Sequence, residues 1–155
     1  MKILRILLSA LGLSVLVACG GGGGASGPQG SISGAVTKGP VRTAVVVAYG
    51  IGSGLRGAQI GTATTDVNGL FSMNIGNYAG AVMLQASGGS YTDEATGSSM
   101  TMASGDVMTA VMPAVVAGAI TGGIRVTPVT AMAQARAQNM AGGMSDANIP
   151  AANAA

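Results

Sequence analysis

From Ser31 onward, the chain consists of short apolar segments separated by clusters of Gly, Pro, Asn and Asp. Segments of this length, rich in Val, Ile and Thr, are typical of β-strands joined by turns. The clearest of them places Phe71, Met73 and Ile75 at strict two-residue spacing, which predicts a strand with one buried face. The sequence therefore predicts a mainly β domain over residues 31–126.

Turn residues set the boundaries of the predicted strands, which cover residues 32–36, 42–49, 59–65, 71–75 and 81–86. The Val-rich segment 42–49 fits a strand that is covered on both faces, and residues 51–57 follow it as a Gly-rich loop. The dipeptide Asn68-Gly69 favours positive φ, so it predicts a tight hairpin that joins the strands on either side of it.

The second half of the domain is less regular. Residues 91–96 and 99–102 fit either two short strands or one long loop. Residues 107–124 carry no charge and approach the length of a membrane span. A proline and several glycines interrupt them, so a buried strand pair with a turn fits better than a spanning helix.

Residues 127–155 are predicted to be helical. Thr127 and Pro128 suit the N-cap and the first helical position, and helical spacing continues through Val129, Met132, Ala133, Arg136 and Met140. Ser145 would cap a second helix, with Pro150 near its start. The chain then stops without an apolar closure, which fits a short or truncated protein.

The N-terminus has the organisation of a secretory signal peptide. Lys2 and Arg5 form a short positive region, residues 6–17 are an almost unbroken apolar run, and the small residues Ala18 and Cys19 follow. The apolar run is too short and wrongly flanked for an ordinary spanning helix.

The four residues Leu16-Val17-Ala18-Cys19 resemble the bacterial lipobox, in which the cysteine becomes the acylated first residue of the mature protein. The resemblance implies a signal peptide over residues 1–18, cleavage between Ala18 and Cys19, and lipid attachment to Cys19. Ordinary signal cleavage beside an unmodified cysteine is the alternative, but the only cysteine of the chain falls where the lipobox requires it. A single acyl chain binds a membrane weakly, so stable anchoring needs the two or three chains that lipobox proteins carry.

Residues 19–30 are the predicted tether between this anchor and the domain. They include five consecutive glycines, and a Gly/Ser-rich chain behaves as a random coil that spans roughly 18 Å at this length. Gly20 also lacks the aspartate that, in enteric-type sorting, retains lipoproteins in the inner membrane. The sequence therefore favours the outer membrane.

Charge gives no argument for a nucleic-acid partner. Seven basic and five acidic residues give the precursor a net charge of +2, and removal of Lys2 and Arg5 with the signal peptide leaves five of each. The chain has no Trp, one Phe and three Tyr, so it offers few stacking platforms for bases. We therefore expect no binding to nucleic acid.

The mature chain also lacks the usual side chains of catalysis. It has no histidine, and its only thiol is at Cys19, which excludes Ser-His-Asp and Cys-His arrangements and the commonest zinc ligands. Lys38 lies in a predicted turn without the Ser-x-x-Lys spacing of a Ser-Lys dyad. With its cysteine acylated, the domain also has no disulfide. We expect no enzyme activity and no cofactor.

Two motifs suggest metal binding and are better explained otherwise. The motif at residues 66–69 resembles the start of a calcium loop, but its twelfth position holds Asn77 in place of the bidentate glutamate. Asp93 and Glu94 are adjacent, so on a strand their side chains would point to opposite faces, and a solvated loop explains the pair better. The thioether pair Met100-x-Met102 would suit copper(I), yet alternating methionines on a strand usually fill a core.

Several segments resemble the carboxypeptidase regulatory-like, or transthyretin-like, β-sandwich module, namely residues 33–41, 48–49 and 61–71. Residues 89–97 and 126–130 resemble proteobacterial lipoproteins that extend this module. Within those proteins the C-terminal helix continues into further sequence.

The resemblance covers roughly residues 30–148 and implies a seven-stranded Greek-key sandwich that acts as a spacer, binding or assembly module. We therefore expect a lipid-anchored cell-envelope protein with a structural or binding role and no catalysis. Its partners would be the membrane, through its lipid, and envelope proteins or glycans. A carbohydrate- or protein-binding accessory module of a larger exported system and Met-based copper handling are the alternatives.

Overall fold

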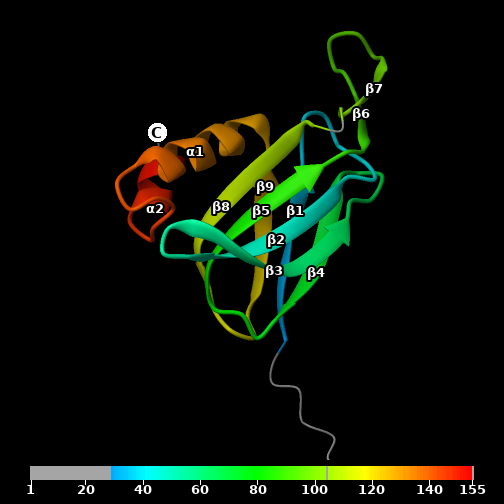
Figure 1. Ribbon diagram of the computed structural model, residues 1–155. Coiled ribbons are helices and arrows are strands. Elements are labelled where there is room, and N and C mark those ends of the chain that lie inside the picture. The colour runs from blue at the N-terminus through cyan, green and yellow to red at the C-terminus, as the bar shows by residue number, and fades with distance from the viewer. Residues whose placement is uncertain (1–28, 104, 155) are drawn as a thin grey trace, which may run out of the picture.

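The computed structural model describes residues 29–103 and 105–154 (Figure 1). They form nine strands: β1 (Gly30–Val36), β2 (Val45–Gly52), β3 (Leu55–Thr64), β4 (Leu70–Gly76), β5 (Gly80–Ser87), β6 (Ser90–Thr92), β7 (Ser99–Thr101), β8 (Val107–Val115) and β9 (Ile120–Val126). Two helices follow, α1 (Pro128–Asn139) and α2 (Asn148–Asn153). The prediction of a mainly β chain with a short C-terminal helical segment is confirmed.

The strands form two main sheets and one small hairpin. The first sheet has the order β4-β1-β9, in which β1 pairs antiparallel with β4 and parallel with β9. The second has the order β3-β2-β5-β8 and is antiparallel throughout. Strands β6 and β7 pair with each other in the small hairpin, and an isolated bridge between Ser90 and Arg42 joins β6 to the segment before β2. The resemblance to the transthyretin-like module implies seven strands, whereas the described residues form nine.

The main core lies between the two sheets. Because side chains alternate along a strand, each sheet turns one row of apolar residues inward. The predicted row of Phe71, Met73 and Ile75 on β4 is buried there, as are Val82 and Leu84 on β5. The largest fully buried side chains are all aliphatic, so this core forms without aromatic packing at its centre.

A second apolar cluster lies on the outer face of the four-stranded sheet, where α1 and α2 cover it (Figure 1). Ala81 and Met83 of β5 pack there with Ile149 of α2. The strands that are covered on both faces are therefore β5 and the first part of β8, whose Ala110 lies in the main core and whose Val111 lies in this second cluster. The prediction of such a strand at residues 42–49 is confirmed only in part, because β2 begins at Val45, which is exposed, and its outward-facing Tyr49 is only half-buried against the second cluster.

The turn at Asn68-Gly69 does not close a hairpin. It joins β3 to β4, which belong to different sheets, so the chain crosses from one layer of the sandwich to the other. The Asp66 carboxylate accepts hydrogen bonds from the Asn68 and Leu70 amides, both at 2.8 Å, and thereby fixes this crossing. Such a crossing and a hairpin share the same turn residues, which is why the sequence pattern did not separate them.

The tight hairpin lies instead within the predicted loop 51–57. Strands β2 and β3 continue to Gly52 and Leu55, and only Ser53 and Gly54 separate them. Both have positive φ, 51° and 73°, as the two-residue type I′ hairpin requires. Residues 90–101, predicted as either two short strands or a loop, form the β6–β7 hairpin.

Residues 107–124 form strands, as predicted, but the strands do not pair with each other. Strand β8 pairs with β5 in the second sheet, and β9 pairs with β1 in the first. Strand β8 is buried over most of its length, whereas β9 is largely exposed. The prediction of a buried pair is therefore wrong for the pairing and for β9. None of the described helices is both long and apolar enough to span a bilayer.

The predicted start of α1 is confirmed, because the Thr127 hydroxyl accepts a hydrogen bond from the Thr130 amide at 3.1 Å. The helix nevertheless buries Gln134 and Ala137 and exposes Val129 and Met132. The predicted cap of α2 is wrong in position: the N-cap is Ala147, which makes no side-chain cap hydrogen bond, and Pro150 lies in the first turn of the helix. Ser145 lies two residues earlier, where its hydroxyl accepts a hydrogen bond from the Asn148 amide at 3.2 Å.

Candidate functional site

The predicted lipid-attachment site cannot be described geometrically. Ala18 and Cys19 lie outside the described residues, as do the signal peptide and all but the last two residues of the predicted tether. The chain enters the described part at Gln29, and β1 begins at Gly30.

The charged end of the sandwich is the end that lies away from this entry point. The β6–β7 hairpin projects from it (Figure 1). Its charged side chains come from the connections at this end, and they are Lys38, Arg42, Asp66, Asp93, Glu94 and Asp106. Contacts between these connections hold them together: Gly39 lies against the Thr92 carbonyl, and Arg42 pairs with Ser90 in an isolated bridge.

Two cations fix the base of the β6–β7 hairpin. The Arg42 guanidinium donates from Nε to the Ser90 hydroxyl at 3.1 Å and from Nη2 to the Ser99 hydroxyl at 3.4 Å. The Lys38 ammonium lies 5.4 Å from the centroid of the Tyr91 ring, within the range of a cation–π contact. The hairpin therefore has a defined base and an exposed tip.

Asp93 organises the tip of the hairpin. Its Oδ1 accepts hydrogen bonds from the Thr96 hydroxyl and amide, both at 2.9 Å, and from the Ala95 amide at 3.1 Å. The hydrogen bonds from Thr96, supported by that from Ala95 and by the charge of Lys38, hold the pKa of Asp93 below its ordinary value. Asp93 and Glu94 lie in the loop between the strands, as predicted.

The calcium motif acts as a turn. The Asp66 carboxylate already accepts backbone amides within its own loop, and that of Asp93 does the same in the hairpin. Within residues 29–103 and 105–154 there is no group of three or more Asp, Glu, His or Cys side chains that could hold a metal ion. The carboxylates of Asp66 and Asp93 therefore hold their own turns.

The methionines of the predicted thioether pair lie in different environments. Met100 on β7 exposes 44% of its surface, whereas Met102 exposes 5% and belongs to the main core. Met102 follows the end of β7, and its amide donates to the Gly89 carbonyl at 3.0 Å. Met102 therefore fills the core, and the two thioethers do not form an exposed pair.

A hollow of about 430 Å³ adjoins the base of the hairpin. Lys38 and Asp106 provide opposite charges at its wall, and Met102 and Met108 provide an apolar floor. The hollow thus combines charged and apolar surface, as the contact surfaces between proteins do.

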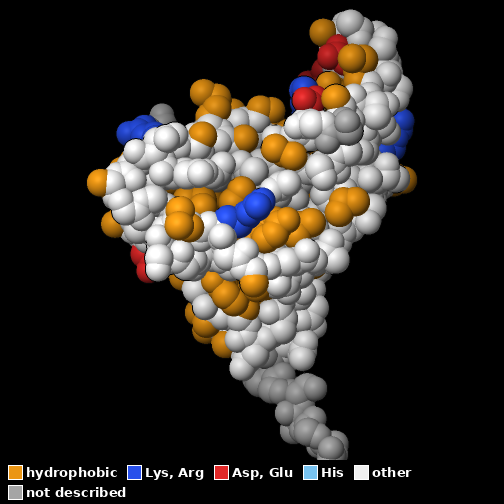
Figure 2. Space-filling model, in the orientation of Figure 1, with side chains coloured by type: hydrophobic (Ala, Val, Ile, Leu, Met, Phe, Trp, Pro, Cys, Tyr) orange, Lys and Arg blue, Asp and Glu red, His pale blue; other side chains and the backbone are white. Residues whose placement is uncertain are grey.

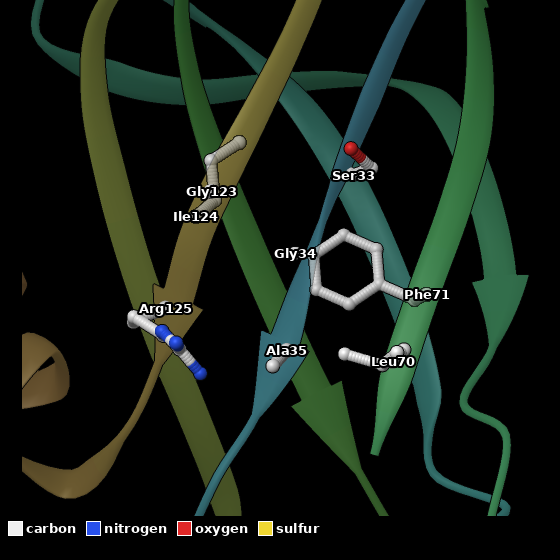
Figure 3. Close-up of a pocket in the computed structure, with 8 residues that line it drawn as sticks. All are labelled: Ser33, Gly34, Ala35, Leu70, Phe71, Gly123, Ile124 and Arg125. Carbon is white, nitrogen blue, oxygen red and sulfur yellow. The ribbon is translucent and has the colours of Figure 1, made fainter. Parts of the chain in front are cut away.

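A second hollow, of about 290 Å³, lies on the three-stranded sheet (Figure 3). Gly34 has no side chain there, because a Cβ would lie 2.1 Å from the Ile124 carbonyl oxygen. The Phe71 ring lies beside Gly34, and Arg125 extends from β9 toward β1 (Figure 3). With Ser33 and Arg125 as its polar side chains, the hollow can hold a small group that accepts hydrogen bonds, but its lining contains no general base.

The sequence did not predict that the charged side chains would share one end. The signal was available in the order of the elements: strands joined by short turns run up and down, so alternate connections meet at the same end. Arg42 was assigned to a strand and Lys38 to a turn, and their common contact with the hairpin depends on a long-range bridge to Ser90.

No family model and no curated protein sequence matches the chain. Among solved structures, the chain is similar to a 9R-lipoxygenase from Cyanothece PCC8801, with 14% identity and a TM-score of 0.37. The match covers 64% of this chain and 16% of the lipoxygenase. At this level the similarity bears on neither fold nor activity.

Proposed function

We propose that the chain is a lipid-anchored cell-envelope protein whose β-sandwich has a structural or binding role and no catalysis. The observation that carries this proposal is the position of Cys19, the only cysteine, at the end of an apolar leader and in a sequence that resembles the lipobox. Acylation there would attach the domain to a membrane, the outer membrane in preference to the inner, through the tether at residues 20–29.

The sandwich is proposed to be a transthyretin-like Greek-key module. Facing sheets of three and four strands, with one apolar core between them, support this assignment. The β6–β7 hairpin and the C-terminal helices would then be additions to the module. A module of this kind serves as a spacer or a binding surface, which agrees with the lack of histidine and of a free thiol after acylation.

A protein partner is favoured over a glycan partner. Sugar-binding sites use exposed aromatic faces, and here Phe71 and Tyr91 are buried while Tyr49 and Tyr78 are partly buried. The charged end offers the better surface, because it combines a projecting hairpin with an adjoining hollow of mixed character. The accessory-module alternative is therefore retained with a protein ligand. Copper handling is disfavoured, because Met102 is in the core.

Substitution of the cysteine tests the anchor. In a bacterial host supplied with labelled palmitate, Cys19→Ser should lose the label and accumulate as unprocessed precursor. Ser26→Ala, in the same tether, is the matched control and should be labelled and processed normally. Normal maturation of Cys19→Ser would overturn the proposal, because ordinary signal cleavage does not need the thiol.

A further inference from the structure

The end of the sandwich opposite the charged end contains an exposed apolar turn. Residues 116–119 join β8 to β9, and the Ala119 amide donates to the Val116 carbonyl at 3.0 Å to close the turn. Val116 exposes 69% of its surface and Ile120 exposes 83%, and Ala117 between them is also exposed. Exposed aliphatic side chains at the tip of a turn have no packing role in the domain itself.

No charge lies on the β4–β5 connection (residues 76–80), the β8–β9 connection (residues 115–120) or the first residues of β1, which together form this uncharged end. The β2–β3 hairpin, which turns beside them, is followed by Arg56, whose guanidinium lies over the Tyr49 ring and donates to Gln85 of β5. The lower part of the molecule in Figure 2 shows hydrophobic side chains and no charged ones on the visible face. Asp146 lies to one side, in a hollow that it shares with Gly80 and Ala114.

The same turn lies against the point where the chain enters the domain. The Ser31 amide donates to the Ala119 carbonyl at 3.0 Å, and Ser31 pairs with Ile120. Gly30 lies beside the backbone of Gly118 and Ala119. Any anchor at Cys19 would therefore hold this turn, and not the charged end, next to the membrane.

We propose that the turn at residues 116–120 inserts into the interfacial region of the bilayer, beside the lipid anchor. This inference rests on the anchoring proposed above and adds a second membrane contact. A tether of ten residues between Cys19 and Gly30 has an r.m.s. end-to-end distance of roughly 18 Å as a random coil, so even a weak apolar contact of the turn with the surface is populated at high effective concentration.

The structure also determines how deep the turn goes. Hydrocarbon offers no hydrogen-bond partners, so a turn with free backbone groups stays at the level of the headgroups and the first acyl carbons. The Val116, Ala119 and Ser31 backbone bonds already satisfy part of the turn. Asp146 at the side would stop further insertion, because a carboxylate is costly in hydrocarbon. The sandwich would thus rest on its uncharged end and direct the β6–β7 hairpin away from the surface.

The test uses the full lipidated chain on vesicles that contain lipids brominated on their acyl chains. An environment-sensitive fluorophore is attached to Ala117→Cys, whose thiol is the only free one because Cys19 is acylated. Val67→Cys is the matched control, because Val67 is also exposed, at 77%, but lies beside Asp66 at the charged end. We expect a blue shift and strong quenching at residue 117 and neither at residue 67.

A second pair of variants separates insertion from mere proximity. With the label at Ala117→Cys, the added changes Val116→Asp and Ile120→Asp should abolish the quenching while the protein still floats with the vesicles. Val67→Asp should leave the quenching unchanged. Both added positions are exposed, so neither variant disturbs the core.

Each failure has its own meaning. If the labelled protein does not float with the vesicles, the anchor itself is wrong. If it floats but residue 117 is not quenched, or if its blue shift depends on protein density and not on bromolipid, the turn contacts water or a second copy of the chain. Either of these last results would overturn the insertion proposal and leave the anchor intact.

Discussion

The two ends of the sandwich differ in how their connections are held. At the charged end, side chains fix the backbone: Thr65, Asp66 and Asp93 each bond backbone groups of the turns around them. At the uncharged end, the β8–β9 turn and its contact with β1 are held by backbone bonds between Val116, Ala119 and Ser31. The contrast is therefore with the β8–β9 turn, since the β4–β5 connection beside it also uses side chains: the Asn74 side-chain oxygen accepts from the Gly76 amide at 2.6 Å, and the Tyr78 hydroxyl donates to the Ala81 carbonyl at 2.8 Å.

This difference predicts where substitutions are costly. Connections that depend on a particular side chain or on close backbone approach tolerate little change, whereas an open turn held by backbone bonds tolerates much. A surface that recognises a partner needs the first kind of construction, and a surface that rests on a lipid headgroup layer needs only the second. The predictions below compare matched positions at the two ends.

The largest effect is expected for Gly69→Ala at the charged end. Gly69 has φ of 75°, and a Cβ there would lie 2.7 Å from the Val36 carbonyl oxygen and 3.0 Å from the Val41 amide nitrogen. The alanine would be strained by the positive φ, and its Cβ would also be too close to the neighbouring backbone. Because both costs apply, we expect the free energy of unfolding to fall by about 3 kcal/mol. Urea denaturation of the two proteins measures it.

Gly76→Ala provides the matched position at the uncharged end. Gly76 also has positive φ, at 62°, but no atom lies within 4 Å of the position that a Cβ would take, so only the strain remains. We expect a loss of about 1 kcal/mol. Equal losses for Gly69→Ala and Gly76→Ala would show that close packing does not distinguish the two ends.

A smaller effect than that of Gly69→Ala is expected when Thr65 is replaced by Val. The buried Thr65 hydroxyl donates to the Val41 carbonyl at 2.6 Å and accepts from the Ala44 amide at 2.8 Å. Valine keeps the shape and leaves both backbone groups without this partner, which costs about 2 kcal/mol. Thermal unfolding should show the loss for Thr65→Val and little change for Thr64→Val, whose side chain is exposed. A Thr65→Val protein of unchanged stability would mean that the crossing does not depend on this hydroxyl.

The sequence predicted strands well because strand formation is local. The alternation of Phe71, Met73 and Ile75 requires only that one face of a strand be buried, and Thr127-Pro128 suits a helix start in any context. Both predictions are confirmed. What the sequence did not predict is pairing, which depends on residues far apart along the chain.

The wrong predictions concern features that depend on contacts between residues far apart along the chain. The turn at Asn68-Gly69 has the same local chemistry whether its strands pair or cross between sheets. The exposure of Val129 and Met132 on α1 depends on which helix face meets β8, where Thr109 donates to Gln134 at 3.2 Å. The sequence did not predict the charged end, because this end is assembled by contacts between residues far apart along the chain, such as that of Arg42 with Ser90.

The smallest expected effect is the response of the β6–β7 hairpin tip to low pH. Because the pKa of Asp93 is held below its ordinary value of 3.8, its ionised form stabilises the hairpin tip above that pH. The stabilisation is lost as the pH falls below 3.8 and through the lowered pKa of the folded protein. Amide signals of Ala95 and Thr96 should therefore shift at a pH below 3.8, while those of Ala119 at the uncharged end should not respond to this titration.

The Thr96 hydroxyl contributes most to lowering the pKa of Asp93, so its removal tests the cause of that shift. Thr96→Ala should move the pKa of Asp93 back toward its ordinary value, because the hydroxyl bond at 2.9 Å is lost while the Thr96 and Ala95 amides still donate. Thr92→Ala, on an exposed residue of β6, is the control and should leave the titration of Asp93 unchanged. If both variants titrate alike, the charge of Lys38 and the backbone amides set the pKa of Asp93, and the hairpin tip does not depend on the Thr96 side chain.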